Sequence, residues 1–246
     1  MSLLQIKDIS MSFGSVKALD GVNLEIGEGT VLGLVGDNGA GKSTLMKIVT
    51  GIYSTNVGSV LLNGVNLFDY SPAGRRLLGI EMIYQDLALS PQQDIASNIF
   101  LGREPTKKVF GLDLGWIDKQ KMKRDSEKII DNLGANVPSV NYISGLLSGG
   151  QQQTVAIARA LTFSPKLVIM DEPTAALAVR EVEHVLQLIL KLKNDGISVI
   201  LISHRLNDIF DVSDNIIVLR QGTIVGDFEK KDTTMNEIVS FIVGAK

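Results

Sequence analysis

One glycine-rich segment has the residue types and the spacing that phosphate binding requires. Residues 36–43 read Gly-Asp-Asn-Gly-Ala-Gly-Lys-Ser and match the pattern G-x-x-x-x-G-K-[ST]. The apolar run Val31–Val35 predicts a strand before the segment, and a helix is predicted over Lys42–Thr50, with Gly51 as its C-terminal cap. In this context the loop turns backbone N–H groups toward phosphate oxygens, and the helix N-terminus adds partial positive charge.

The residues of this loop have distinct expected roles. Lys42 is expected to reach the β and γ phosphates of a nucleotide, and the Ser43 hydroxyl to ligate Mg²⁺. A glycine-rich turn that happens to precede a lysine is the plainer alternative, but it does not explain the strand–loop–helix context. The residues expected to bind the nucleotide are Gly36, Asp37, Asn38, Gly39, Ala40, Gly41, Lys42, Ser43 and Thr44.

Two adjacent carboxylates follow a second apolar strand. Asp171 and Glu172 come directly after Leu167–Met170, and Pro173 ends the strand. Because adjacent residues leaving a strand point to different sides, the two can have different roles. Asp171 suits Mg²⁺, through its water shell, and Glu172 suits the attacking water as general base or orienter. The alternative is that Asp171 and Glu172 form only a solvated acidic turn. This alternative is less favoured because a phosphate loop lies upstream, with Lys42 129 residues before Asp171 (171 − 42).

Two further polar residues follow strand candidates. His204 comes after Val199–Ile202 and Gln85 after Ile80–Tyr84. Taken singly, such a histidine is usually structural and such a glutamine means little. In an open parallel sheet, however, ligands bind outside the carboxyl ends of the strands. We therefore predict catalytic roles for Lys42, Gln85, Glu172 and His204, with His204 bonding the γ phosphate and the attacking water. Mg²⁺ ligation is predicted for Ser43, Gln85 and Asp171.

The elements that must position these residues can be read from hydrophobic patterning. Alternation over the first 30 residues, and an Asn63-Gly64 turn within 58–67, predict an antiparallel layer. The short apolar runs predict a buried parallel sheet. Residues 88–164 show no clear strand but do show helical stretches at Asp94–Leu101 and Asp118–Leu133, which indicates a helical insertion. A hairpin over Asn215–Phe228, turning at Gln221-Gly222, and a helix near Thr234–Val243 complete the prediction.

Composition excludes several classes of protein. The 246 residues carry 24 Lys and Arg against 27 Asp and Glu, a net charge of -3, which argues against a general nucleic-acid binder. The chain has no cysteine, so disulfides and thiolate metal sites are excluded. No apolar run approaches the ~18 residues of a membrane span.

A second helix start also suggests a phosphate. Residues 147–151 read Leu-Ser-Gly-Gly-Gln, and Ser148 with Gln151 forms an S-x-x-Q capping box. The capping box does not explain Gly149 and Gly150, because glycine in a first helical turn costs roughly 1 kcal/mol against alanine. Something must approach this backbone closely, and a phosphate is the obvious candidate. If the two helix starts came from different subunits, a triphosphate could be sandwiched between them.

With these motifs in this order, the chain resembles the nucleotide-binding subunits of ATP-binding cassette (ABC) transporters. LSGGQ at 147–151 resembles their signature sequence, Gly36–Ser43 their Walker A loop and Leu167–Glu172 their Walker B strand. Gln85 resembles the Q-loop glutamine and His204 the switch histidine. The expected fold class is α/β: a P-loop NTPase core with a mostly parallel sheet, an N-terminal antiparallel β subdomain and an inserted α-helical subdomain. As one cassette over 1–246, it would place the core in 1–87 and 165–246 and the helical signature subdomain in 88–164.

The resemblance implies how such a protein works. Two subunits sit head to tail on ATP and Mg²⁺, so that Leu147, Ser148, Gly149, Gly150 and Gln151 act on the partner's nucleotide. Phe13 matches the aromatic that stacks on adenine. The Q-loop and the helical insertion receive a membrane permease subunit, and a solute-binding protein acts indirectly. The expected location is the cytoplasmic face of the cell membrane, as a peripheral subunit.

One departure from the usual pattern of the family indicates a particular group within it. After Glu172 the chain has Ala178 where the family usually has the D-loop aspartate, which puts in doubt the usual communication between the two sites. This loss, followed by Val179-Arg180-Glu181, resembles importers of ribose, xylose and galactose type, and the stretches 82–87 and 98–104 point the same way. Those ATPases often carry two cassettes in one chain, so a homodimer and one half of a longer protein both remain open.

Two other classes of function compete with an importer ATPase. A cassette ATPase acting on DNA or ribosomes is less favoured, because long coiled coils are absent between Lys42 and Asp171 and only one cassette is present. A non-catalytic, nucleotide-sensing interaction subunit is less favoured because Lys42, Glu172 and His204 are all intact.

Overall fold

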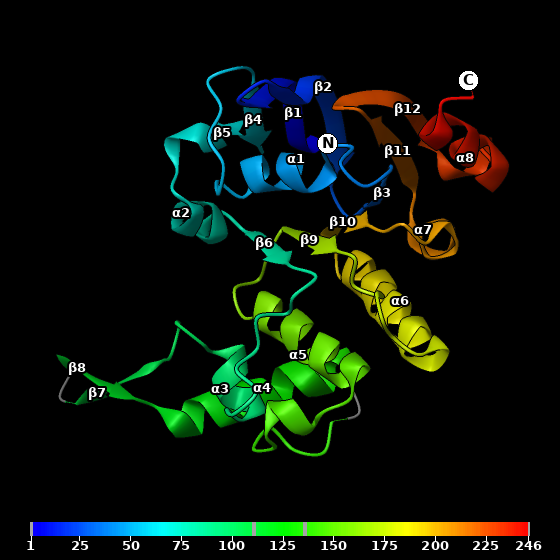
Figure 1. The fold of residues 1–246 in the computed structure, drawn as a ribbon. Coiled ribbons are helices and arrows are strands. Elements are labelled where there is room, and N and C mark those ends of the chain that lie inside the picture. Colours follow the sequence, from blue (N-terminus) through cyan, green and yellow to red (C-terminus); the bar gives the residue numbers. More distant parts are fainter. Residues whose placement is uncertain (1, 110–111, 135–136, 246) are drawn as a thin grey trace. The chain divides into compact units, whose positions relative to one another are not determined.

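The computed structural model describes residues 2–109, 112–134 and 137–245 (Figure 1). The chain divides into two compact units. Unit 1 consists of Met1–Gln85, Pro165–Pro173 and Ile189–Lys246, and unit 2 of Asp86–Ser164 and Thr174–Leu188. Residues 174–188, which the sequence analysis placed with the core, therefore cluster with the signature segment. Within the described ranges, no helix combines the length and the apolarity needed to cross a bilayer.

A six-stranded sheet in unit 1 positions the strand ends that carry polar residues. Its order is β12-β11-β3-β10-β9-β6, and all neighbours run parallel except β12, which pairs antiparallel with β11. The strands are β3 (Val31–Val35), β6 (Ile80–Ile83), β9 (Leu167–Asp171), β10 (Ser198–Ile202), β11 (Asn215–Arg220) and β12 (Thr223–Glu229). Each of the four predicted parallel strands is present, and these four are consecutive in the sheet. The predicted hairpin turns at Gln221-Gly222, both with positive φ.

A four-stranded antiparallel sheet forms the second layer of unit 1, as predicted. Its order is β2-β1-β4-β5, from β1 (Ser2–Phe13), β2 (Val16–Gly27), β4 (Ser59–Leu62) and β5 (Val65–Asn66). Asn63 and Gly64 form the predicted turn, with φ values of 48° and 80°. The helices of unit 1 are α1 (Lys42–Val49), α2 (Pro72–Leu77), α7 (Leu206–Val212) and α8 (Met235–Val243), together with the end of α6 (Val179–Asn194).

The core of unit 1 explains why α1 is fixed in place. Leu45, Met46, Ile48 and Val49 of α1 are fully buried and belong to one apolar cluster with side chains of both sheets. Figure 1 shows α1 between the antiparallel strands β1, β2 and β4 and the strands β6, β9 and β10. Burying each of these side chains stabilises the unit by about 1.5–3 kcal/mol. The N-terminus of α1 is therefore held rigidly against the sheet.

Unit 2 is mainly helical and contains one short ribbon of strands. Its helices are α3 (Ile95–Ile99), α4 (Lys119–Leu133) and α5 (Gly149–Leu161), together with the first part of α6 (Val179–Asn194). Asp94 and Asp118 are the N-caps of α3 and α4, and their side chains accept hydrogen bonds from Ser97 N–H and Lys121 N–H. These capping contacts explain why the predicted helical stretches begin at the two aspartates.

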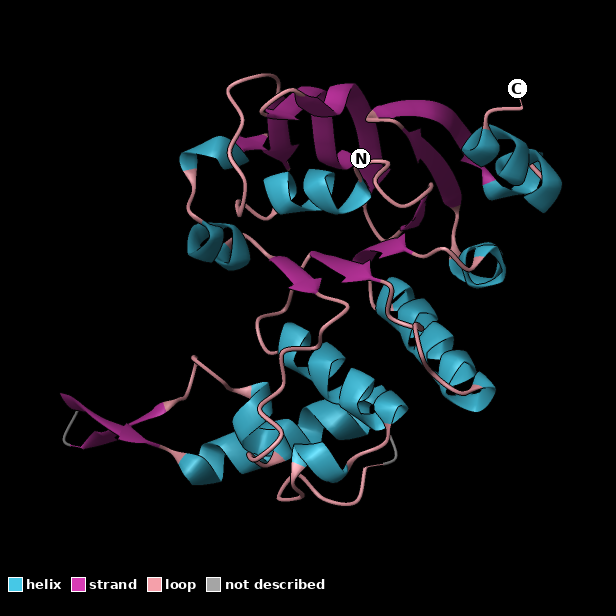
Figure 2. Cartoon of the chain, in the orientation of Figure 1, coloured by secondary structure: helices cyan, strands magenta, loops and turns pink. Residues whose placement is uncertain are grey.

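The prediction that residues 88–164 contain no strand is wrong. β7 (Thr106–Val109) and β8 (Leu112–Ile117) pair antiparallel, and Figure 2 shows them as a magenta ribbon beside the cyan helices of the same unit. β7 reads Thr-Lys-Lys-Val, which lacks the apolar alternation that marks a half-buried strand. β8 reads Leu-Asp-Leu-Gly-Trp-Ile, in which apolar residues do alternate with others, so this strand could have been predicted from the sequence.

A buried polar network holds unit 2 together. Asn98 is fully buried, and its Oδ1 accepts from Ser90 N–H at 2.7 Å while its Nδ2 donates to Ser144 Oγ at 2.9 Å and Ser90 O at 3.0 Å. Ser144 Oγ in turn donates to Ser90 O at 2.7 Å. The network ties the segment that follows Gln85 to the segment that precedes the signature helix. Because Asn98 and Ser144 are buried, losing one of them leaves polar groups of the other without that partner.

Asn98→Ala is therefore expected to destabilise the protein by about 3 kcal/mol, because the Ser90 N–H and the Ser144 hydroxyl lose buried partners. The midpoint of thermal unfolding, followed by circular dichroism, should fall by roughly 5–10 °C. Asn141→Ala is the matched control, since Asn141 is exposed. Equal melting temperatures for the two variants would contradict this account of the network.

Candidate functional site

The phosphate loop takes its shape from close packing against its own unit. Gly41 is the N-cap of α1 with φ of 108°, and a Cβ there would lie 2.7 Å from Ala18 O. Gly36 has φ of 147°, and a Cβ there would lie 2.0 Å from Leu219 O. Only glycine can adopt these backbone angles readily and also fit where a Cβ would clash with a neighbouring backbone oxygen. The fold of β2 and β11 around the loop therefore requires both glycines before any ligand is considered.

The side chain of Lys42 folds back into the phosphate loop. Its Nζ donates to Gly36 O at 2.6 Å and to Asp37 O at 3.0 Å, and the residue is 9% exposed. Burial lowers the pKa of Lys42, and the negative charges of Glu172, Asp171 and Asp37 act in the opposite direction. The ammonium group thus lies among carbonyl oxygens, at a place where phosphate oxygens could replace them as acceptors.

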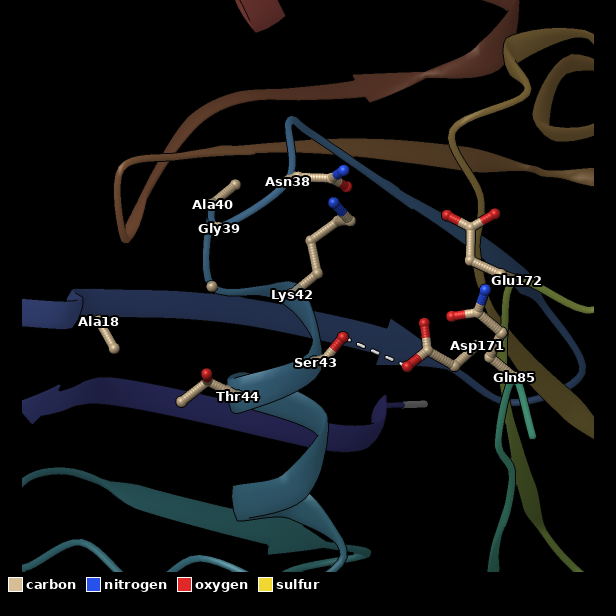
Figure 3. Close-up of a pocket in the computed structure, with 11 residues that line it drawn as sticks. Ala18, Asn38, Gly39, Ala40, Lys42, Ser43, Thr44, Gln85, Asp171 and Glu172 are labelled. Atoms are coloured by element: carbon tan, nitrogen blue, oxygen red, sulfur yellow. Dashed lines mark hydrogen bonds between the residues drawn. The ribbon is translucent and has the colours of Figure 1, made fainter. Parts of the chain in front are cut away.

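Asp171 and Ser43 meet across the pocket. Ser43 Oγ donates to Asp171 Oδ2 at 3.2 Å, and Figure 3 shows Gln85 beside Asp171. Burial raises the pKa of Asp171, while the Ser43 hydrogen bond and Lys42 lower it. The described residues contain no cluster of three or more His, Cys, Asp or Glu side chains that could hold a metal. The hydroxyl, carboxylate and amide oxygens instead fit Mg²⁺, which takes few protein ligands and completes its shell with phosphate and water.

Glu172 leaves the strand in an unusual backbone conformation. Its φ is 53°, and its N–H donates to Ile202 O of the neighbouring strand at 2.9 Å. Such a conformation in a non-glycine residue costs of order 1–3 kcal/mol and is found where the surroundings enforce it. Glu172 and Asp171 nevertheless line the same pocket.

His204 contacts Glu172 directly. Its Nδ1 lies 2.7 Å from Glu172 Oε2, and the histidine side chain is 65% exposed against 14% for the glutamate. The sequence predicts a role for His204 at the γ phosphate and the attacking water, but it does not predict this contact. Because β10 and β9 are neighbours in the sheet, the residues just beyond their ends are brought together.

One pocket of about 220 Å³ collects most of the predicted residues (Figure 3). It is smaller than the ~300–1,000 Å³ of typical small-molecule pockets, which suits a phosphate chain better than a whole nucleotide. Gly36, Asp37 and His204 lie next to the pocket without lining it. The lining residues are Ala18, Asn38, Gly39, Ala40, Gly41, Lys42, Ser43, Thr44, Gln85, Asp171 and Glu172.

Phe13 lies outside this pocket, at the turn between β1 and β2. The side chain is 45% exposed and packs edge-on against Tyr53, with ring centroids 5.4 Å apart. Lys47 Nζ lies 5.3 Å from the centre of the Tyr53 ring. Sequence reasoning missed Tyr53, although an aromatic residue shortly after the helix of the phosphate loop could have drawn attention to it.

The signature segment begins α5, in unit 2, with the predicted capping box. Ser148 Oγ accepts from Gln151 N–H at 3.3 Å, and Gln151 Oε1 accepts from Ser148 N–H at 3.1 Å. The two glycines are indeed closely approached, but by the chain itself. A Cβ at Gly150 would lie 2.9 Å from Glu181 Cβ, and a Cβ at Gly149 would lie 2.9 Å from Leu177 Cδ2. A phosphate is therefore not needed to explain this pair of glycines.

Glu181, on the first turn of α6, is a second residue to which sequence reasoning gave no role at the site. Its Oε1 accepts from Gly150 N–H at 3.1 Å and its Oε2 from Ala178 N–H at 3.1 Å. The Ser148 hydroxyl, then the Gly150 and Ala178 N–H groups, lower the pKa of the Glu181 carboxyl. The A-x-x-E spacing at 178–181 is a signal for this role, because it matches the glutamate half of a capping box.

The sheet, the phosphate loop and the paired acids define a P-loop nucleotide-hydrolysing protein. Residues 19–175 match the family model of the ABC transporter, and the chain belongs to this family. The resemblance drawn from the motifs is thereby confirmed.

Relatives with assigned functions lie within the same family. The chain is 47% identical to the xylose/arabinose import ATP-binding protein of Sulfolobus acidocaldarius, over 98% of the chain and 96% of that protein. It is 44% identical to the ribose import ATP-binding protein of Caldanaerobacter subterraneus subsp. tengcongensis, over 98% of the chain and 48% of that protein. The chain thus spans nearly all of the first relative and about half the length of the second.

Solved structures confirm the predicted α/β cassette fold. A nucleotide-free ATP-binding cassette from an ABC transporter matches with a TM-score of 0.84 at 29% identity, over 99% of this chain and 96% of that one. A dimeric ATP-binding cassette in a post-hydrolysis state, bound to ADP and Pi, matches with a TM-score of 0.77 at 26% identity, over 94% of this chain and all of that one.

Lys42→Ala is expected to lower ATP turnover by about 100-fold or more, because it removes the buried cation next to the transferred phosphate. Steady-state phosphate release by the purified protein measures this effect. Lys128→Ala, which removes an exposed lysine of α4, should leave turnover unchanged. Equal turnover in the two variants would refute the role given to Lys42.

Proposed function

We propose that this chain is the ATP-binding and ATP-hydrolysing subunit of an ABC importer that takes up a monosaccharide. The observation that carries the proposal is the joint placement of Lys42, Gln85, Asp171 and Glu172 around one pocket at the ends of neighbouring parallel strands. Membership of the ABC transporter family supports ATP as the nucleotide. The names of the xylose/arabinose and ribose import relatives support a pentose or a similar sugar as the solute.

The geometry supports a division of labour within the pocket. Lys42 would bind the β and γ phosphates, and the N–H groups at the start of α1 would bind the remaining oxygens. Ser43, Asp171 and Gln85 would hold Mg²⁺, which when bound neutralises developing charge on the phosphates. Glu172 would accept a proton from the attacking water. His204, against Glu172 Oε2, would hold that carboxylate in place and reach the γ phosphate when nucleotide is bound.

A second copy of the chain would complete the site. In this proposal Leu147, Ser148, Gly149, Gly150 and Gln151 of one copy face the triphosphate bound by the phosphate loop of the other. The N-terminus of α5 is a suitable anion site, since its first N–H groups lack intrahelical acceptors. The likeness to a dimeric cassette bound to ADP and Pi supports the head-to-tail arrangement.

As the ATPase subunit of an importer, the chain would have further protein partners. Membrane permease subunits would dock on the Q-loop region and the helical unit 2, so that closure on ATP moves them. A solute-binding protein would act indirectly, and the ATPase would lie at the cytoplasmic face of the membrane. Uptake of labelled xylose, arabinose, ribose or galactose into vesicles that hold the chain with its permease subunits tests this role. ATP hydrolysis without uptake of any sugar would overturn the assignment to monosaccharides.

Glu172→Gln is expected to bind ATP but to hydrolyse it at least about 100-fold more slowly, because the neutral amide cannot accept the proton. The trapped nucleotide should then hold two copies together. Analytical ultracentrifugation with Mg·ATP should show a dimer that the same variant does not form with ADP. A variant that stays monomeric at high protein and ATP concentrations would contradict the sandwich arrangement.

Phe13→Ala is expected to raise the dissociation constant for ATP by up to about tenfold, which corresponds to ~1.4 kcal/mol of lost stacking on adenine. Fluorescence titration with a labelled ATP analogue measures this constant. Tyr70→Ala is the matched control, because Tyr70 has a similar exposure of 39% against 45% for Phe13. If both variants bind as the parent does, the base stacks elsewhere.

A further inference from the structure

The start of the signature helix already has an anion bound to it, and the anion belongs to the same unit of the chain. Glu181 Oε1 accepts from Gly150 N–H at 3.1 Å, and the Ser148 hydroxyl hydrogen-bonds to the same carboxylate. Gly150 has no side chain, so the Cβ and Cγ of Glu181 come within about 3 Å of where one would stand. The carboxylate is thus seated on the helix N-terminus by packing as well as by hydrogen bonds.

The donors that bind this carboxylate are donors that the proposed function gives to the partner's triphosphate. One N–H group and one hydroxyl cannot make full hydrogen bonds to a carboxylate and to a phosphate at the same time. Two anions at this place would also repel each other. The approach of a triphosphate therefore requires Glu181 Oε1 to leave Gly150.

The second carboxylate oxygen gives Glu181 a tether. Oε2 accepts from Ala178 N–H at 3.1 Å, which is the glutamate half of a capping box at the start of α6. Ala178 has no side-chain oxygen of its own with which to cap this helix. Glu181 can therefore release Gly150 and keep its bond to Ala178, so the displaced carboxylate stays nearby and can return.

We propose that Glu181 is a built-in competitor for the signature helix, which a partner's triphosphate must displace before the ATP-bound dimer closes. The proposal rests on the proposed function and adds a regulatory residue to it. Ala178, which keeps its bond to Glu181 Oε2, lies in the segment that follows Glu172 and Pro173 in the chain. In this chain the carboxylate of Glu181 thus links the signature helix to that segment, at the point where Ala178 lacks a carboxylate.

The test uses the hydrolysis-deficient Glu172→Gln protein, in which dimerisation by Mg·ATP can be measured at equilibrium. Adding Glu181→Gln keeps the size of the side chain but replaces charge-assisted hydrogen bonds by weaker neutral ones. The ATP concentration that gives half-maximal dimer should fall by roughly tenfold, because a closed dimer displaces this residue twice. ATP binding to the monomer, measured at protein concentrations too low for dimer, should not change.

Two further variants make the test decisive. Glu183→Gln makes the same change of charge at an exposed position of the same helix and should leave the half-maximal ATP concentration as in the parent. Glu181→Ala removes the carboxylate altogether in a residue type that favours helix, so it should lower that concentration as Glu181→Gln does, even if the glutamine variant folds poorly.

The outcomes separate this inference from the proposed function. If the Glu181 variants dimerise at the same ATP concentration as the Glu183 control, or need more ATP, the carboxylate does not compete and the inference is overturned. If the Glu172→Gln parent itself forms no dimer with ATP, the sandwich arrangement fails, and the inference fails with it.

Discussion

The architecture of unit 1 depends on holding charged groups partly out of water at the carboxyl ends of parallel strands. Burial acts against the charge of Lys42 and against that of Asp171, and each is partly compensated by the other. Burying charges is costly unless they are paired and hydrogen-bonded. A rigid sheet, with α1 packed against it through Leu45 and Ile48, is what keeps these groups in place.

The groups proposed to bind phosphate have internal partners in the structure as it stands. The Lys42 ammonium bonds to loop carbonyls, the Ser43 hydroxyl to Asp171, and the Gly150 N–H to Glu181. Buried polar groups such as the Lys42 ammonium and the Gly150 N–H require such partners. Binding of nucleotide is then an exchange of hydrogen bonds, and the affinity reflects the difference between the ligand and the internal substitute rather than the sum of new contacts.

The N-termini of α1 and α5 obtain their internal partners in different ways. At α1 the glycines are required by the close packing of β2 and β11, and a cation fills the loop. At α5 the glycines make room for residues of α6 and the segment before it, and an anion covers the helix N-terminus. Glycine is therefore required for different structural reasons at the two helix starts. Only at α5 is the N-terminus covered by a negatively charged group, which has the same sign of charge as a phosphate.

The sequence by itself determined the strands, the helices with their caps, and the polar residues at four strand ends, because these depend on local patterns of apolar, turn and capping residues. It missed β7, which lacks such a pattern, and β8, although apolar residues alternate along it. Only the tertiary structure decided that His204 meets Glu172, that Tyr53 packs on Phe13 and that Glu181 caps Gly150. Those contacts join residues 31 or more positions apart (181 − 150 for the nearest pair), and sheet order and helix packing, not local preference, bring them within reach.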